Sequence, residues 1–411
     1  MSEAFSGHRH QVFSRGFYRD DDFDYTVRCV LGAASTGGSD IGEVLATIDG
    51  VPDGDHQKWF DAWLATGRRL RELADAERAA GRTVSASSSY LRAATYLSVA
   101  VDAASALADD RQLLPTFGLH RSSWDGFVDT SGLSVARVGI PYQTDSLPGY
   151  LFSPAGREAR PTLIMVNGSD GAISSLWHSG GAGALARGYN VLMFDGPGQQ
   201  SMLFERGIGF RPDWGPVLTP VVDFVLAQDG VDPARIAVYG ISQAGYWVAD
   251  ALTVEHRLAA AVLDPGVVDV AASWLVHIPA SLKKLFDGGK RDAFDRDMAL
   301  GMKFSAAEAR TWAFRARPYG KPGYFDTLSE VCRYALSDED ATRIRTPLLI
   351  TSPEHEQFWP GQSAALAAKV SAPVELAEFT AAQGADFHCQ PLARQLTEAK
   401  MFGWLETTLA D

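Results

Sequence analysis

The first part of the chain carries apolar residues at helical spacing. Residues 22–34, 56–80 and 86–108 each predict a helix, and Ser39 is placed to cap a further helix that continues to Ile48. The segment 86–108 is rich in small residues, which let helices approach closely. No catalytic motif occurs in this part. We therefore expect residues 1–131 to form a helical domain that packs on, or forms a lid over, the rest of the chain.

The pattern changes at Gly132. LSVARVGIPY and LPGYLFSP predict two antiparallel strands with a turn near Asp145. Continuous apolar runs follow, separated by segments of helical spacing: PTLIMV, YNVLMF, RIAVYG, LAAAVLD, TPLLI and PVELAEF. Such runs are typical of strands that are buried on both faces of a parallel sheet. Residues 132–411 are thus predicted to form an α/β domain with a mostly parallel, doubly wound sheet.

A long insertion, residues 267–343, interrupts this alternation between two strands. It is rich in aromatic residues and contains several predicted helices. Because it follows the carboxyl end of a strand, it would lie at the sheet edge where ligands bind in α/β folds. We expect it to form a helical cap over a ligand site.

Composition excludes several classes of partner. The chain has 411 residues, 46% of them hydrophobic and 21% charged, with a net charge of −13 and no Lys/Arg cluster. These values disfavour nucleic acid and anionic membranes as partners, and no run of about 18 apolar residues suggests a membrane span. The N-terminus lacks the apolar core of a signal peptide. Three widely spaced cysteines fit a reducing cytoplasm, and no metal or other cofactor is expected. A homodimer could form through the helical domain.

The sequence RIAVYGISQAGYWVA predicts a strand, a sharp turn and a helix, with Ser242 on the turn. This is the context of the nucleophile elbow G-x-S-x-G, in which the serine hydroxyl stands above the sheet edge. Ala244 occupies the place of the second glycine, and Gly245 follows it. The pattern predicts Ser242 as a nucleophile.

A serine nucleophile needs a base and an acid that orients the base. His388, in the loop AAQGADFHCQ, is the one histidine beyond the last predicted strand, where the base belongs. The acid is expected after the strand TPLLI, where Glu356 lies four residues before Pro360. We prefer Glu356, with Glu354 and Asp264 as alternatives.

An oxyanion hole needs two hydrogen-bond donors. We expect the backbone N–H of Gln243 and, from the loop after PTLIMV, that of Ser169 or Asp170. Asp195, which begins the motif DGPGQQS, is expected to hold loop amides. His178 could face the mouth of the pocket, but a surface position is preferred.

These motifs resemble the α/β-hydrolase superfamily across residues 132–411. The segments that show the resemblance are ARGYNVLMFDGPGQQ, RIAVYGISQAG, TPLLITSPEHEQFWPGQS and GADFHCQ. Together with SYLRAATYL they resemble the branch with an N-terminal helical domain, which includes dihydroxypseudooxynicotine hydrolase, fungal pigment polyketide-shortening hydrolases and FrsA-like esterases. The chain departs from the pattern at Gln200, where glycine is common, and at Ser352, where aspartate is common. The resemblance implies a Ser242–His388–Glu356 triad.

The chain is thus predicted to act on a small-molecule carbonyl substrate. The first hypothesis is hydrolysis of a C–C bond next to a ketone in a small aromatic or polyketide-like compound, since several members of the branch cleave such bonds. The alternatives are a carboxylesterase acting on small acyl esters, an acyltransferase and a non-catalytic binding protein.

Overall fold

A computed structural model describes residues 16–156 and 158–410, and its centre is one eight-stranded sheet. The strand order across the sheet is β1-β2-β4-β3-β5-β6-β7-β8. The strands are β1 (Ser134–Tyr142), β2 (Asp145–Ser153), β3 (Arg160–Val166), β4 (Asn190–Phe194), β5 (Val231–Ile241), β6 (Ala260–Asp264), β7 (Leu348–Pro353) and β8 (Val374–Phe379).

Two antiparallel pairings begin the sheet, and the remaining pairings are parallel. Strand β1 pairs with β2, and β2 pairs with β4, both antiparallel. From β4 to β8 all neighbours run parallel. The predicted α/β class with a mostly parallel, doubly wound sheet is confirmed.

Helices cover both faces of the sheet because alternate residues of each strand point to opposite sides. The helices of this part are α7 (Ile173–Leu176), η3 (Trp177–Gly181), α8 (Ala182–Ala186), α9 (Gln200–Phe204), α10 (Gly215–Leu226), α11 (Ala244–Ala251), α18 (Gln362–Lys369), η5 (Ala381–Gln383) and α19 (Arg394–Thr408). On one face of the sheet, Ile164 and Val166 of β3 share a core with α10, α11 and α18. On the other face, Leu163 and Met165 share a core with α7, α8 and α19.

The helical segment 173–186 is broken. Helix α7 ends at Leu176, a wide turn follows, and α8 begins at Ala182. Gly180 in this turn has φ 146°, a conformation that interrupts a regular helix.

Helices precede β1, as the sequence predicts. They are α2 (Asp21–Gly32), η1 (Ala33–Thr36), α3 (Ile41–Ile48), α4 (His56–Ala79), α5 (Thr83–Ala106), η2 (Asp110–Gln112) and α6 (Leu113–Thr130), and much of their apolar surface forms a separate core. The cap of α3 differs from the prediction. Asp40 accepts hydrogen bonds from the N–H groups of Gly42 and Glu43, whereas the Ser39 hydroxyl donates to the carbonyl of Val30.

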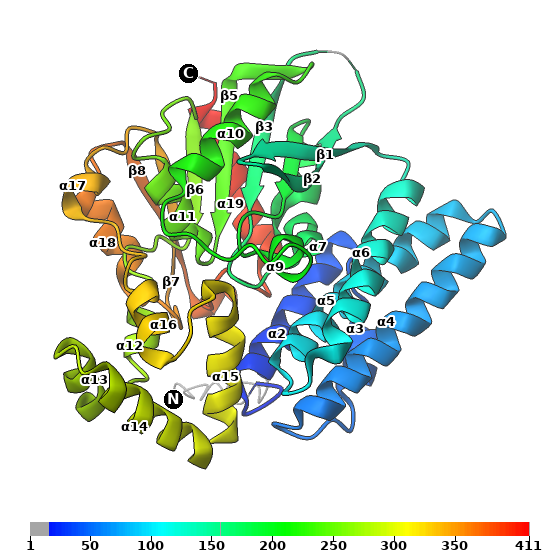
Figure 1. Ribbon diagram of the computed structural model, residues 1–411. Coiled ribbons are helices and arrows are strands. Elements are labelled where there is room, and N and C mark those ends of the chain that lie inside the picture. Colours follow the sequence, from blue (N-terminus) through cyan, green and yellow to red (C-terminus); the bar gives the residue numbers. More distant parts are fainter. Residues whose placement is uncertain (1–15, 157, 411) are drawn as a thin grey trace, which may run out of the picture.

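The insertion between β6 and β7 is also helical. It contains α12 (Ala272–Leu275), α13 (Ala280–Asp287), α14 (Arg291–Phe304), α15 (Ala306–Ala316), η4 (Arg317–Tyr319), α16 (Tyr324–Val331) and α17 (Asp338–Ala341). Figure 1 shows helices α2–α6 and helices α12–α16 below the sheet, with α15 beside α5. The N-terminal helices and the insertion thus meet over one edge of the sheet.

Candidate active site

Ser242 lies on a strained turn between β5 and α11. Its φ is 57°, in the left-handed region that non-glycine residues rarely occupy, and its N–H donates to the carbonyl of Asp264 at 2.6 Å. The flanking glycines are required by close contacts. A Cβ on Gly240 would lie 2.6 Å from the carbonyl oxygen of Ala244, and one on Gly245 would lie 1.9 Å from that of Pro265. The tight turn therefore needs glycine at 245 and tolerates alanine at 244.

A hydrogen-bonded chain joins the three residues that the sequence predicts as a triad. The Ser242 Oγ lies 2.9 Å from His388 Nε2, and His388 Nδ1 lies 2.8 and 2.9 Å from the two carboxylate oxygens of Glu356. The His388 and Glu356 side chains are only 2% and 5% exposed. Because a carboxylate only accepts hydrogen bonds, Nδ1 carries the proton and Nε2 is left to accept from the serine hydroxyl. The arrangement can remove a proton from Ser242.

Backbone groups keep Glu356 ionised. Its Oε1 accepts from the N–H groups of Phe358 and Trp359 at 3.0 and 3.2 Å. Burial tends to raise the pKa of this carboxyl, but the His388 ring and these two N–H groups outweigh burial, so the pKa lies below its ordinary value. The acid is thus fixed and charged before any substrate binds.

The two alternative acids are engaged elsewhere. Glu354 accepts from the N–H of Ala381. Asp264 is fully buried and accepts from Tyr239, Thr351 and Gln390. These hydrogen bonds assign Asp264 a structural position under the elbow rather than one beside the base.

His388 is held by groups from two parts of the chain. Its backbone N–H donates to the Gln357 side chain at 3.0 Å, and its carbonyl accepts from the Tyr25 hydroxyl of α2 at 3.0 Å. Phe358 packs edge-on against its ring, with centroids 4.8 Å apart. Tyr25 was not predicted, because nothing in its local sequence marks a residue that contacts a loop more than 350 positions away.

The expected oxyanion-hole donors flank the nucleophile. Among the described residues, the backbone N–H groups of Gln243, Ser169 and Asp170 donate to no backbone carbonyl, and all three residues line the cavity that contains Ser242. Gly168 lies directly against Ser242, since a Cβ added there would be 2.8 Å from the serine Cβ. The Gln199 carboxamide donates to the carbonyls of Asn167 and Gly168 and so holds this loop in place. These contacts leave N–H groups free beside Ser242.

Asp195 ties the sheet to the N-terminal helices. It accepts from the Ser201 hydroxyl at 2.5 Å and from its N–H at 3.4 Å, in keeping with the expected structural role, and it also pairs with Arg121 of α6.

The prediction of a surface position for His178 was wrong. Its ring is buried, with Nδ1 2.8 Å from the Thr36 hydroxyl and Nε2 2.9 Å from the Thr95 hydroxyl. Burial lowers the pKa of His178 to about 3, so the ring is neutral. His178 thus connects η3, which precedes α8, to the N-terminal helices.

Ser242 opens into a cavity of about 420 Å³. The N-terminal helices line it with residues that include Tyr25 and Asp102, and the insertion contributes Trp274 and Tyr319. Its further aromatic lining is Phe23, Trp59, Phe204, Phe210, Phe314, Phe358 and Trp359. The helical region and the cap therefore both form walls of the site.

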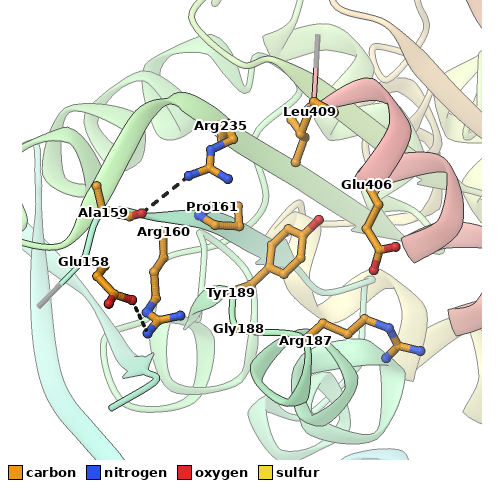
Figure 2. Close-up of a pocket in the computed structure, with 11 residues that line it drawn as sticks. Glu158, Ala159, Arg160, Pro161, Arg187, Gly188, Tyr189, Arg235, Glu406 and Leu409 are labelled. Atoms are coloured by element: carbon orange, nitrogen blue, oxygen red, sulfur yellow. Dashed lines mark hydrogen bonds and ion pairs between the residues drawn. The ribbon is translucent and has the colours of Figure 1, made fainter. Parts of the chain in front are cut away.

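A second pocket lies away from this chemistry. Figure 2 shows it lined by charged side chains at the amino ends of β3 and β5, where Arg160 pairs with Glu158 and Arg235 donates to the carbonyl of Ala159. This is the edge of the sheet opposite Ser242, which follows the carboxyl end of β5.

Two further properties of residues 16–156 and 158–410 concern membranes and metal ions. None of their helices is long and apolar enough to cross a membrane. They also contain no group of three or more His, Cys, Asp or Glu side chains placed to hold a metal ion.

Fold and site together define a hydrolase-type α/β protein with a serine at the elbow, and known proteins agree with this class. No family model matches the chain. Hydrolase LUC6 of a Fusarium species is 30% identical over 97% of this chain and 98% of its own length. The 20-hydroxy-prefusarin hydrolase FUS2 of Gibberella moniliformis is 28% identical over 98% of each. Hydrolase acrC of Aspergillus aculeatus is 38% identical, but the match covers 60% of this chain and 62% of that protein.

A solved structure shows the same fold over most of the chain. The crystal structure of the 2,6-dihydroxy-pseudo-oxynicotine hydrolase superposes with a TM-score of 0.69 at 17% identity, covering 92% of this chain and 95% of that one. The chain belongs to the α/β-hydrolase superfamily and is a hydrolase related to fungal members of it.

Proposed function

We propose that this hydrolase uses Ser242, His388 and Glu356 as a catalytic triad and cleaves a C–C bond next to a ketone in a small aromatic or polyketide-like substrate. The observation that carries the proposal is the unbroken chain of hydrogen bonds from Ser242 through His388 to Glu356 on the wall of a cavity.

In the first half of the reaction, Ser242 Oγ attacks the ketone carbon while His388 Nε2 accepts its proton. Glu356 stabilises the imidazolium, and the N–H groups of Gln243 and of Ser169 or Asp170 hold the oxyanion. The C–C bond then breaks, its electron pair leaves as an enolate, and His388 returns the proton to that fragment. The product is released and an acyl group stays on Ser242.

In the second half, His388 removes a proton from water as the water attacks the acyl carbon. The tetrahedral intermediate collapses, the bond to Ser242 Oγ breaks, and His388 gives the proton back to the serine. A carboxylic acid leaves. The same residues serve both halves, so no further reactant besides water is needed.

The cavity walls favour a ketone substrate with an aromatic or extended apolar part. The walls include nine aromatic side chains besides Tyr25, among them Trp274 and Phe314 of the cap. One relative is named for action on 20-hydroxy-prefusarin. A largely apolar site also limits the solvation of an enolate leaving group by water.

Hydrolysis of small acyl esters is the second candidate, because the same triad would expel an alcohol in place of an enolate. The cavity is partly open, and its lining includes the half-buried residues Arg310 and His56. Substrate comparison separates the two functions.

The first experiment is intact mass after treatment with a fluorophosphonate, for wild type and Ser242→Ala. One adduct on wild type and none on the variant is the expected result. Turnover of 1-phenylbutane-1,3-dione and of 4-nitrophenyl acetate is then compared. Cleavage of the diketone supports C–C hydrolysis, and ester turnover alone supports the esterase. An unlabelled wild type would contradict the triad itself.

A further inference from the structure

Three polar side chains on the cavity wall are buried without hydrogen-bond partners. Gln200, Gln243 and Tyr319 are only 3%, 4% and 5% exposed, and all three line the cavity that contains Ser242. Among the described residues, the Gln200 amide oxygen and nitrogen, the Gln243 amide nitrogen and the Tyr319 hydroxyl have no partner.

Such groups are unusual in a folded protein. Most buried polar atoms are hydrogen-bonded, and each one left unpaired lowers the stability of the fold. Apolar residues of the same shape would avoid that cost. Three unpaired polar groups on one cavity wall therefore point to a ligand that pairs with them.

The three side chains belong to one packed surface. Gly198, two residues before Gln200, lies directly against Phe210, and the Phe210 N–H donates to the carbonyl of Pro318 at 2.8 Å. The Phe210 ring packs on Tyr319, with centroids 5.3 Å apart. The loop that presents Gln200 thus contacts the turn that presents Tyr319.

Gln243 adjoins Tyr319 from the other side. Burial raises the pKa of Tyr319, and a side-chain hydrogen bond with Gln243 lowers it by less. This contact is loose, since neither the Gln243 amide nitrogen nor the Tyr319 hydroxyl has a hydrogen bond of normal geometry. Tyr319 remains a protonated donor, and the Gln243 amide nitrogen is a second donor beside it.

We propose that Gln200, Gln243 and Tyr319 form a specificity subsite that binds uncharged oxygen groups, ketone and hydroxyl, in the part of the substrate away from the scissile bond. This proposal rests on the proposed function of the cavity and deepens it by naming the substrate class. Tyr319 and Gln243 would donate to a ketone oxygen. The Gln200 amide, which offers both a donor and an acceptor, would pair with a hydroxyl or an enol.

The hydrogen-bonding groups of the three side chains suit an uncharged oxygen. Two carboxamides and one phenol carry no formal charge and offer neutral donors and one acceptor, which match ketone and hydroxyl oxygens. Arg315, which acts electrostatically on Tyr319, and Arg394 also line the cavity, but neither belongs to the three groups of the subsite.

The experiment compares 4-nitrophenyl hexanoate with its 3-oxo and 5-oxo derivatives. The three esters share a chain length and a leaving group and differ only in a distal ketone. Wild type, Gln200→Met, Gln243→Met and Tyr319→Phe are each assayed for kcat/KM. Wild type is expected to prefer at least one oxo ester, and each variant that removes a donor to its ketone should lose about 3- to 10-fold of that preference. Hexanoate turnover should change little in Gln200→Met and Tyr319→Phe. Gln243 adjoins Ser242 and the expected oxyanion hole, so Gln243→Met is judged by its ratio of oxo ester to hexanoate turnover alone.

Tyr334→Phe is the matched control. Tyr334 is fully buried and its hydroxyl is also unpaired, but it packs behind Tyr319, with ring centroids 5.2 Å apart, and does not line the cavity. Its variant should keep the wild-type preference. Melting temperatures of the ligand-free variants should stay equal or rise, because each substitution removes an unpaired polar group.

Two results would overturn the subsite. One is a wild type that hydrolyses all three esters without preferring an oxo ester, and the other is a preference that survives in all three variants. Fluorophosphonate labelling of Ser242 is measured on the same samples. Loss of labelling in wild type would refute the triad, whereas intact labelling with no oxo preference would refute the subsite alone.

Discussion

Replacing Glu356 with glutamine tests the assignment of the triad acid. In the wild type, Oε1 already accepts from the N–H groups of Phe358 and Trp359, and both oxygens face His388 Nδ1 at 2.8 and 2.9 Å. A glutamine would keep its carbonyl oxygen on the two backbone donors, since an amide nitrogen cannot accept from them. Its NH₂ group would then take the place of Oε2, next to His388 Nδ1.

That substitution inverts the tautomer of the base. An NH₂ group donates to Nδ1, so Nδ1 must become the acceptor and the ring proton moves to Nε2, which faces Ser242. The imidazole then has no lone pair for the serine proton, and the carboxylate that stabilised the imidazolium is lost. In serine proteases the equivalent change lowers kcat by about 10⁴-fold, which corresponds to about 5 kcal/mol of transition-state free energy. We expect a loss of the same order.

The assay is kcat for the best substrate of the panel, with fluorophosphonate labelling rates as a second readout. Glu354→Gln is the matched control, because this carboxylate is exposed, lies two residues before Glu356 and accepts from the N–H of Ala381 in η5. It should keep activity within about 3-fold of wild type, the range of one exposed hydrogen bond. A Glu356→Gln enzyme within 10-fold of wild type, or an equally damaged Glu354→Gln enzyme, would refute the reasoning.

Three further predictions concern the N-terminal helices. Tyr25→Phe removes the donor to the carbonyl of His388 and should lower kcat/KM and the labelling rate by about 3- to 10-fold; unchanged rates would show that the hydrogen bond does not position the base. Arg121→Met leaves Asp195 buried and unpaired and should lower the free energy of unfolding by about 3 kcal/mol in urea, with part of the loss recovered in the double variant with Asp195→Asn. Burial, with a smaller contribution from Asp170, raises the pKa of Asp102 well above its ordinary value. The folded state therefore keeps the proton, and stability falls as pH rises from about 4 through the folded pKa. The melting-temperature advantage of Asp102→Asn should accordingly grow from pH 5 to pH 8, and a constant difference would contradict the raised pKa.

The sheet and the residues around the nucleophile were predictable because local signals specify them. Continuous apolar runs located the parallel strands, and a strand–Gly–x–Ser–helix sequence located the elbow at Ser242. His388 followed from the order of elements, since it is the histidine beyond the last strand. The choice of Glu356 over Glu354 depends on which carboxylate accepts the N–H groups of the following turn, and the position of Pro360 only hinted at that turn.

Contacts between distant segments were not predictable from local pattern. The local sequence shows His178 only as a polar residue near a turn. Its burial depends on Thr36 and Thr95 of the N-terminal helices, whose hydroxyls hydrogen-bond to its ring. The turn that follows α7 also packs closely on distant residues, since a Cβ on Gly181 would lie 2.0 Å from the Met193 side chain of β4. A single sequence records neither contact.

The same limit explains why the N-terminal helices were assigned a packing or lid role and no share in the chemistry. Tyr25 lies in an amphipathic helix, where an aromatic residue is expected in a core, but its hydroxyl reaches the carbonyl of His388. Arg121 pairs with Asp195 at the end of β4. Since the base loop is bonded to one helix and the sheet to another, displacement of the helical region would disturb the His388 position as well as open the cavity. If the substrate entered by a rigid movement of all these helices, His388 would therefore lose its position. A local movement between α15 and α5 would leave His388 in place.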